Sequence, residues 1–166
     1  MYYFKYKTWG EGKATESNFF SLLKGKYPNA REATLEEQYQ HIDYICDLGT
    51  IDVKGKKRKS RSSNFNLDIV WIEFKSNEGY QGWIYGEQDF IALERPYGFI
   101  LVKTPDLRKL AESLCNTGEM VAKSSDALYK GYTRKDRKDL LSMISIKDVL
   151  TIPYSILPYN NLEQLY

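Results

Sequence analysis

The clearest helical pattern lies near the start of the chain, in ATESNFFSLLKGKYP at residues 14–28. Phe19 and Leu23 stand four residues apart and so share one face of a helix. Thr15 is a favourable N-cap, and the glycine and proline that close the segment favour a helix end there. The pattern therefore predicts a helix whose apolar stripe faces the core.

The clearest strand pattern is GTIDVKG at residues 49–55, in which apolar and charged side chains alternate. Since successive side chains of a strand point to opposite faces, Ile51 and Val53 share one face and Asp52 and Lys54 share the other. The preceding CDLGT supplies the residues of a tight hairpin turn. A carboxylate and an ammonium on a pleated sheet are costly to bury unless something nearby uses them.

Weaker patterns predict the remaining elements. Residues 30–46 indicate a strand, a turn and a second strand, although TLEEQYQ has reasonable helix propensity. The segments after residue 55 are, in chain order, a long loop at 55–66, a strand at 67–75, a helix at 83–95 despite Gly86, a buried strand at 97–103 suited to a sheet centre, and a helix at 105–114. This order predicts an α/β fold on a central mixed sheet flanked by helices. The pattern assigns no element to the end of the chain.

Length and composition narrow the class of protein. The 166 residues suit one domain, with a core at about residues 10–105 and a C-terminal extension at 106–166. No apolar stretch is long enough to span a bilayer and the N-terminus lacks a signal-peptide pattern, so we expect a cytoplasmic protein. Cys46 and Cys115 lack metal-binding spacing, and we expect free thiols rather than a zinc site or a disulfide.

Acidic residues gather where the predicted hairpin would bring them together. Folding the hairpin places Asp43 almost opposite Asp52, and two facing carboxylates repel unless a cation lies between them. Mg²⁺ or Mn²⁺ suits such oxygen ligands, and the backbone carbonyl of Val53 would add a third. Lys54 shares the face of Asp52, where an ammonium could orient a metal-bound water. Glu16, on the core-facing side of the first helix, could reach the metal or its waters, although the helix dipole alone would also favour it there.

These residues resemble the PD-(D/E)xK nuclease superfamily. The resemblance lies in Glu16, HID at 41–43 and IDVK at 51–54, in helix, strand, strand order. It covers about residues 10–105, with a following helix and the strand at 97–103 in the expected places. It implies a restriction-endonuclease-like core and a Mg²⁺-dependent endonuclease acting on nucleic acid, with DNA as the expected substrate. Many members act as dimers, so a homodimer is also expected.

The resemblance assigns roles residue by residue. By position, Glu16 matches the helix acid, Asp43 the first strand acid, Asp52 the acid of the D/E-x-K element and Lys54 its lysine. Two departures stand out. Ile42 occupies the position of the nominal proline, and the strand at 67–75 is added before the second helix.

A second D/E-x-K element leaves an alternative open. Glu73 and Lys75 have the same spacing, and with Asp52 as first acid they form D-x20-E-x-K. Antiparallel pairing across the long loop would bring Glu73 close to Asp52 as an accessory metal ligand. Glu73 and Lys75 are equally consistent with an exposed ion pair. We favour Asp52 and Lys54, because Asp43 and Asp52 need only a short hairpin to meet.

The segment that follows Lys54 is strongly basic and would suit contacts with phosphates that flank the scissile bond. The residues assigned to nucleic-acid binding are Lys56, Lys57, Arg58, Lys59 and Arg61. A solvated hairpin tip is the competing interpretation. TRKDRK at 133–138 is a weaker signal because Asp136 dilutes its charge. The rival functions are a nucleic-acid-binding protein without catalysis on the same fold and a structural protein of a larger assembly. His41, the only histidine, is expected to make a structural hydrogen bond on the strand of Asp43.

Overall fold

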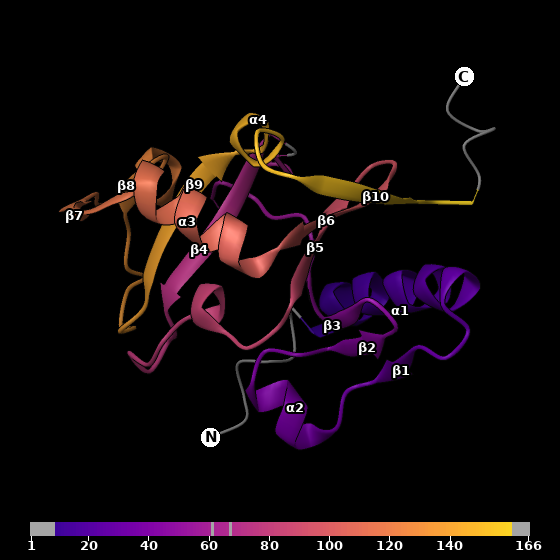
Figure 1. Cartoon of the computed structure of the whole chain (residues 1–166). Helices are drawn as coiled ribbons and strands as arrows, with labels where there is room; N and C mark the ends of the chain where they lie inside the picture. Colours follow the sequence, from indigo (N-terminus) through magenta and orange to yellow (C-terminus); the bar gives the residue numbers. More distant parts are fainter. Residues whose placement is uncertain (1–8, 61, 67, 161–166) are drawn as a thin grey trace. The chain divides into compact units, whose positions relative to one another are not determined.

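The computed structural model describes residues 9–60, 62–66 and 68–160 (Figure 1). The chain forms two compact units that alternate along the sequence. The first unit comprises residues 1–55, 88–101 and 155–166, and the second comprises residues 56–87 and 102–154. The second stretch of the second unit begins at residue 102, close to residue 105, where the predicted core ends. The single domain that the length predicts stays a prediction.

The first unit is built around a six-stranded mixed sheet in the order β1-β2-β3-β5-β6-β10. The strands are β1 (Arg31–Glu32), β2 (Tyr44–Cys46), β3 (Gly49–Lys54), β5 (Phe90–Arg95), β6 (Gly98–Lys103) and β10 (Tyr154–Pro158). Strand β2 pairs antiparallel with β1 and with β3, whereas β3 and β5 are parallel. Parallel neighbours need a crossover connection, and here residues 55–89 provide it. The predicted mixed α/β architecture is confirmed at this level.

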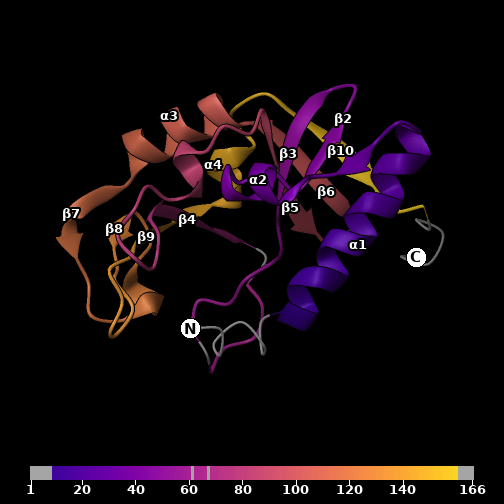
Figure 2. The same cartoon turned by 90° about the horizontal axis from the view of Figure 1, so that it is seen from below.

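Helix α1 (Trp9–Lys26) packs on one face of this sheet, as Figures 1 and 2 show. Its Phe19 and Leu23 are fully buried against Ile51 and Val53 of β3. The predicted stripe and the end of the helix are confirmed. The predicted start is wrong, because Thr15 lies inside the helix, where its hydroxyl donates to Glu94 instead of capping the N-terminus.

Two local predictions around the hairpin are resolved by the structure. TLEEQYQ contains the short helix α2 (Leu35–Tyr39), whose N-terminus Thr34 caps in a capping box with Glu37. His41 is not on a strand, contrary to expectation. It lies in the turn before β2 with a φ of 61°, a left-handed conformation that non-glycine residues adopt in turns rather than strands.

The predicted helix at 83–95 is wrong. The segment forms a single 3₁₀ turn, η1 (Trp83–Tyr85), and then β5. Ile91, Ala92 and Leu93 of β5 are buried on both faces, and residues 90–93 of the strand pair with β3. Pairing with a buried neighbour outweighs local helix propensity. Among the described residues between β3 and β5 there is no α-helix, so the second helix that the family resemblance implies is not found there.

The second unit contains two small sheets. Strand β4 (Ile69–Lys75) pairs antiparallel with β9 (Leu140–Ser145), and β7 (Asn116–Met120) pairs in parallel with β8 (Lys130–Gly131). The remaining elements are α3 (Thr104–Leu114), α4 (Ile146–Val149) and the 3₁₀ turn η2 (Ser124–Asp126). The predictions of β4, β6 and α3 are confirmed, whereas β9 and β10 arise in the stretch to which the pattern assigned no element.

Two further expectations are tested by the described residues. Cys46 is buried and Cys115 half-buried, and both are free thiols as predicted. None of the described helices combines the length and apolar character needed to cross a membrane.

Candidate functional site

The β2–β3 hairpin brings Asp43 and Asp52 to facing positions. Its register pairs Tyr44 with Ile51 and Cys46 with Gly49, which leaves a two-residue turn. Asp43 directly precedes β2 and Asp52 follows Ile51 on β3, so the two aspartates are neighbours at the open end of the hairpin, where the Asp43 carboxylate acts on Asp52. The predicted register is therefore confirmed, and the alternation of side chains along β3 decides which face carries Asp52.

The Asp43 carboxylate is held in place by the backbone of β3. Its Oδ2 accepts a hydrogen bond of 2.8 Å from the N–H of Val53, and the N–H of Asp43 donates to the carbonyl of Ile51 at 2.9 Å. The N–H and C=O of one strand residue point toward the same neighbouring strand. The Val53 carbonyl therefore faces the edge of β3 at which the Asp43 carboxylate lies. This orientation is needed if the two oxygens are to bind the same metal ion.

Asp52 is almost completely buried, with 2% of its surface exposed. Its Oδ1 lies 2.9 Å from Nζ of Lys54, whereas its Oδ2 has no hydrogen-bond partner among the described residues. Burial raises the pKa of Asp52 to about 8, against the opposing effect of Lys54 and with a further increase from the Asp43 carboxylate. A buried carboxylate with an unsatisfied oxygen beside a second carboxylate would gain from a cation or a proton.

Glu16 approaches the same group of residues from α1. The hydroxyl of Tyr44 donates to the Glu16 carbonyl at 3.1 Å, which fixes this turn of the helix on β2. Partial burial raises the pKa of Glu16, the Asp43 carboxylate raises it further, and the Lys54 ammonium opposes both. Glu16 is thus within electrostatic reach of Asp43 and Lys54, and the structure brings together the four residues that the sequence assigned to catalysis.

His41 lies next to these charges. Burial lowers the pKa of its imidazole, Lys54 lowers it further, and Asp43 acts in the opposite direction. The backbone N–H of His41 donates to the carbonyl of Gln38 in the turn. The lowered pKa favours a neutral imidazole, the form in which histidine can accept a hydrogen bond.

The donor set determines which metal could bind. Among the residues that the structure describes, no group of three histidine, cysteine, aspartate or glutamate side chains is arranged to hold a metal ion. Asp43, Asp52 and the Val53 carbonyl are a smaller, all-oxygen set. Mg²⁺ and similar hard cations bind through one or two carboxylates and complete their shell with water and substrate phosphate. Asp43, Asp52 and the Val53 carbonyl therefore suit such an ion. In this structure the Asp52 carboxylate contacts Lys54.

The alternative ligand Glu73 lies on a different sheet. Strand β4 pairs with β9, and the two neighbours of β3 are β2 and β5. The expected pairing of the Glu73 strand with β3 is therefore wrong. Glu73 and Lys75 belong to the second unit, whereas Asp43, Asp52 and Lys54 belong to the first.

The described phosphate-binding candidates lie in the second unit, on a segment that we call the basic loop and of which the structure describes residues 56–60 and 62–66. It follows Lys54 in the chain after Gly55. Lys56, Lys57 and Arg58 are exposed and Lys59 is half-buried. Arg61 lies outside the described residues.

One buried interaction beside the site was not predicted. The hydroxyl of Thr15 donates to Oε2 of Glu94 at 3.1 Å, and both side chains are buried. A Cβ atom added at Gly55 would lie 3.3 Å from the Thr15 hydroxyl and 3.4 Å from Glu94 Oε2. Because Gly55 has no side chain, the chain at the end of β3 can approach Thr15 and Glu94 closely. Thr15 precedes Glu16 in the sequence, and Gly55 follows Lys54. Assigning 83–95 to a strand would have placed Glu94 on the face of Ala92, toward α1.

Comparison with protein-family models, curated proteins and solved structures found no match to this chain. The family resemblance of the motif residues is therefore a prediction from the sequence. The candidate site rests on the chain's own geometry: a confirmed hairpin register, facing aspartates and a lysine paired with one of them.

Proposed function

We propose that this protein is a divalent-metal-dependent nuclease that hydrolyses phosphodiester bonds in DNA. The observation that carries the proposal is the facing pair Asp43 and Asp52 with the Lys54 amine on Asp52. The raised pKa of Asp52 supports it, because strongly perturbed carboxylates in a cluster of charges are typical of functional sites. A restriction-endonuclease-like core is part of the proposal, supported by the order of α1, the β2–β3 hairpin and parallel β5.

Asp43, Asp52 and the Val53 carbonyl would hold Mg²⁺ or Mn²⁺. The buried, unsatisfied Oδ2 of Asp52 is the atom that supports this assignment most directly. A bound ion would lower the pKa of an attacking water and neutralise charge on the phosphate. Asp52 must be ionised to act as a metal ligand. The positive charge of the metal ion beside it would favour the carboxylate form.

The other two residues would act on the attacking water and on the phosphate. The Lys54 ammonium, now on Asp52, could donate to the water or to a phosphate oxygen and stabilise negative charge that develops there. Glu16 would accept a hydrogen bond from a water on the side of α1. Its raised pKa is consistent with this role, because a carboxyl that binds protons more tightly is a better general base.

A cleavage assay tests the proposal. Supercoiled plasmid, linear DNA, single strands and RNA are incubated with Mg²⁺ or Mn²⁺ and with EDTA. We expect metal-dependent cleavage of DNA that Asp52→Asn, Asp43→Asn and Lys54→Ala each lower by at least about 100-fold. Asp47→Asn is the matched control, because Asp47 is an exposed turn residue of the same hairpin. Cleavage that persists unchanged in Asp52→Asn and Lys54→Ala would remove this site from consideration.

A second candidate is a nucleic-acid-binding protein without catalysis. The ion pair between Asp52 and Lys54 favours it, together with the finding that the described residues contain no three-residue metal group. A buried Asp52 that is protonated or paired with Lys54 needs no metal. Salt-dependent binding to DNA in EDTA, with no cleavage of any substrate in Mg²⁺ or Mn²⁺, would select this candidate.

A further inference from the structure

The backbone of the basic loop forms hydrogen bonds within the loop and with Trp71 of β4. Arg58 pairs antiparallel with Phe65, and Asn66 N–H donates to the Lys57 carbonyl at 3.0 Å. The indole N–H of Trp71, on β4, donates to the Arg58 carbonyl at 2.9 Å. A hairpin tip that only keeps a protein soluble needs none of these contacts. These hydrogen bonds hold the backbone of the loop at Lys57, Arg58, Phe65 and Asn66.

An aromatic ring lies beneath two of the cations of this loop. Phe65 is 38% exposed, which is unusual for a phenylalanine. Nζ of Lys56 lies 5.4 Å and Cζ of Arg58 lies 4.7 Å from the centre of the ring. The loop thus combines a partly exposed aromatic ring with two positive charges that lie over it. Such a combination binds unpaired nucleotides, whose bases stack on the ring while their phosphates contact the cations.

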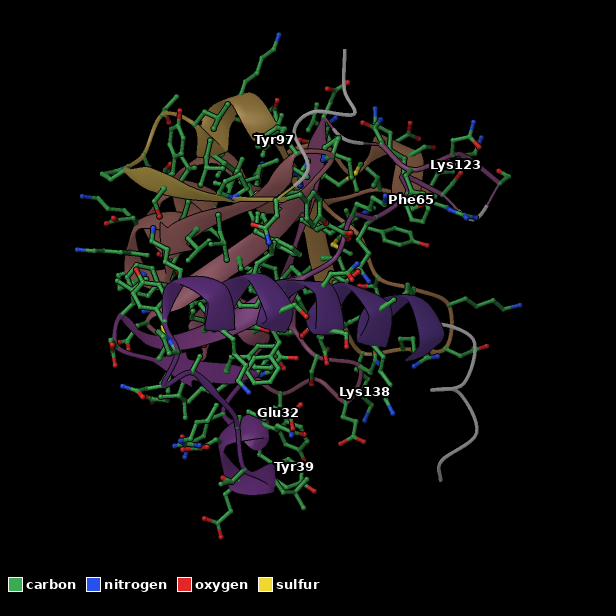
Figure 3. All side chains as sticks on the ribbon, turned by 90° about the vertical axis from the view of Figure 1, so that its right-hand side faces the viewer. Glu32, Tyr39, Phe65, Tyr97, Lys123 and Lys138 are labelled. Atoms are coloured by element: carbon green, nitrogen blue, oxygen red, sulfur yellow. The ribbon has the colours of Figure 1, made fainter. Side chains whose placement is uncertain are left out.

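The second basic segment, at residues 133–138, is built differently. The Arg134 guanidinium forms an ion pair with the buried carboxylate of Asp139 at 2.5 Å and donates to the side-chain amide oxygen of Asn77. These contacts give Arg134 a structural role in joining two turns of the second unit. Figure 3 shows Lys138, which belongs to this segment, well apart from Phe65. The aromatic and cationic combination thus belongs to the basic loop.

We infer that the basic loop binds single-stranded nucleic acid, with one base stacked on Phe65 and the adjacent phosphates contacted by Lys56 and Arg58. Duplex bases are already stacked on their neighbours, so an exposed ring on a surface loop has no base face to meet there. The inference deepens the proposed function by naming the form of substrate. Its test measures binding alone and does not require cleavage.

The experiment measures binding of the full chain in EDTA by fluorescence anisotropy. The probes are a thymidine single strand of about 20 nucleotides, a duplex of equal length and a strand of equal length without bases. Phe65→Leu keeps an apolar side chain but removes the π face, and Phe65→Tyr keeps the π face. Tyr80→Leu is the matched control, because Tyr80 is an aromatic residue of the same unit that is 72% exposed. Thermal unfolding of each variant checks that it is folded.

The stacking and charge contributions give different signatures. Phe65→Leu weakens binding of the thymidine strand about tenfold or more and changes binding of the duplex and the base-free strand less than about twofold. Phe65→Tyr and Tyr80→Leu bind as the wild type does. Arg58→Gln weakens binding of all three probes and reduces the slope of log affinity against log salt by about 0.7 for the single strands.

Two kinds of result overturn the inference. The first is a wild-type protein that binds the duplex as tightly as the single strand or binds no probe. The second is a Phe65→Leu variant whose affinity falls equally for all three probes or does not fall. Loss of the strand preference in a protein that still cleaves DNA refutes only this inference. Intact strand preference in a protein that cleaves nothing refutes only the nuclease proposal.

Discussion

The buried Asp52 carboxylate makes a sharp prediction about stability and pH in metal-free solution. Its pKa is about 8 in the folded protein and has an ordinary value of 3.8 in an unfolded chain. The folded state therefore binds the proton more tightly than the unfolded state. A raised pKa contributes stability that is fully present below about pH 4 and is lost as the pH rises toward 8. Asp52→Asn removes this titration while keeping the size of the side chain.

The size of the effect follows from the pKa shift. Each pKa unit corresponds to about 1.4 kcal/mol. Between about pH 4 and pH 7, the wild type should lose about 4 kcal/mol of unfolding free energy relative to Asp52→Asn. Because Asp52 is 2% exposed, solvent screens this effect little. The pKa of about 8 already includes the opposing effect of the Lys54 ammonium, so the ion pair does not reduce the expected loss of stability any further.

Urea unfolding in EDTA, followed by tryptophan fluorescence from about pH 4.5 to about pH 7.5, measures the difference. We expect the wild-type free energy to fall with pH relative to Asp52→Asn with a slope near 1.4 kcal/mol per unit. Asp47→Asn, at an exposed position, should follow the wild type. Parallel curves for the wild type and Asp52→Asn would refute the reasoning. A wild type that gains stability with rising pH would show that the ion pair with Lys54 outweighs burial.

Two further substitutions, each with a control variant, test the packing around the hairpin and α1. Thr15→Val removes a buried hydrogen bond to the Glu94 carboxylate and should lower the free energy of unfolding by about 1.5 to 3 kcal/mol, whereas Thr15→Ser should retain most of it; equal stability of the two variants would contradict the assigned bond. Gly49→Ala should cost more than about 1 kcal/mol, because φ is 132° there and the added Cβ would collide with the Asp89 carboxylate. Gly25→Ala, on the helix α1 with open space around it, should be neutral or stabilising by up to about 1 kcal/mol, and urea unfolding that ranks the two alanines alike would count against the strained turn.

The local pattern of residues is enough to predict the parts of the site that depend on near neighbours. Asp43 and Asp52 face each other because a two-residue turn and a strict alternation leave one register that buries Ile51 and Val53. The stripe of α1 likewise depends on spacing within one helix. In both cases the residues that interact lie within about ten positions of each other, so the local pattern contains the information.

Elements whose partners are distant in sequence take their form from packing in the folded chain. Residues 90–95 have an apolar run that suits a helix or a strand, and pairing with β3, about 40 residues earlier, selects the strand. Strand β4 joins β9 rather than β3, and Thr15 serves Glu94 rather than the helix terminus. Each choice depends on which buried surface the chain can complete across a long separation. Local periodicity does not encode this, because the free energy comes from packing between segments and not from either segment alone.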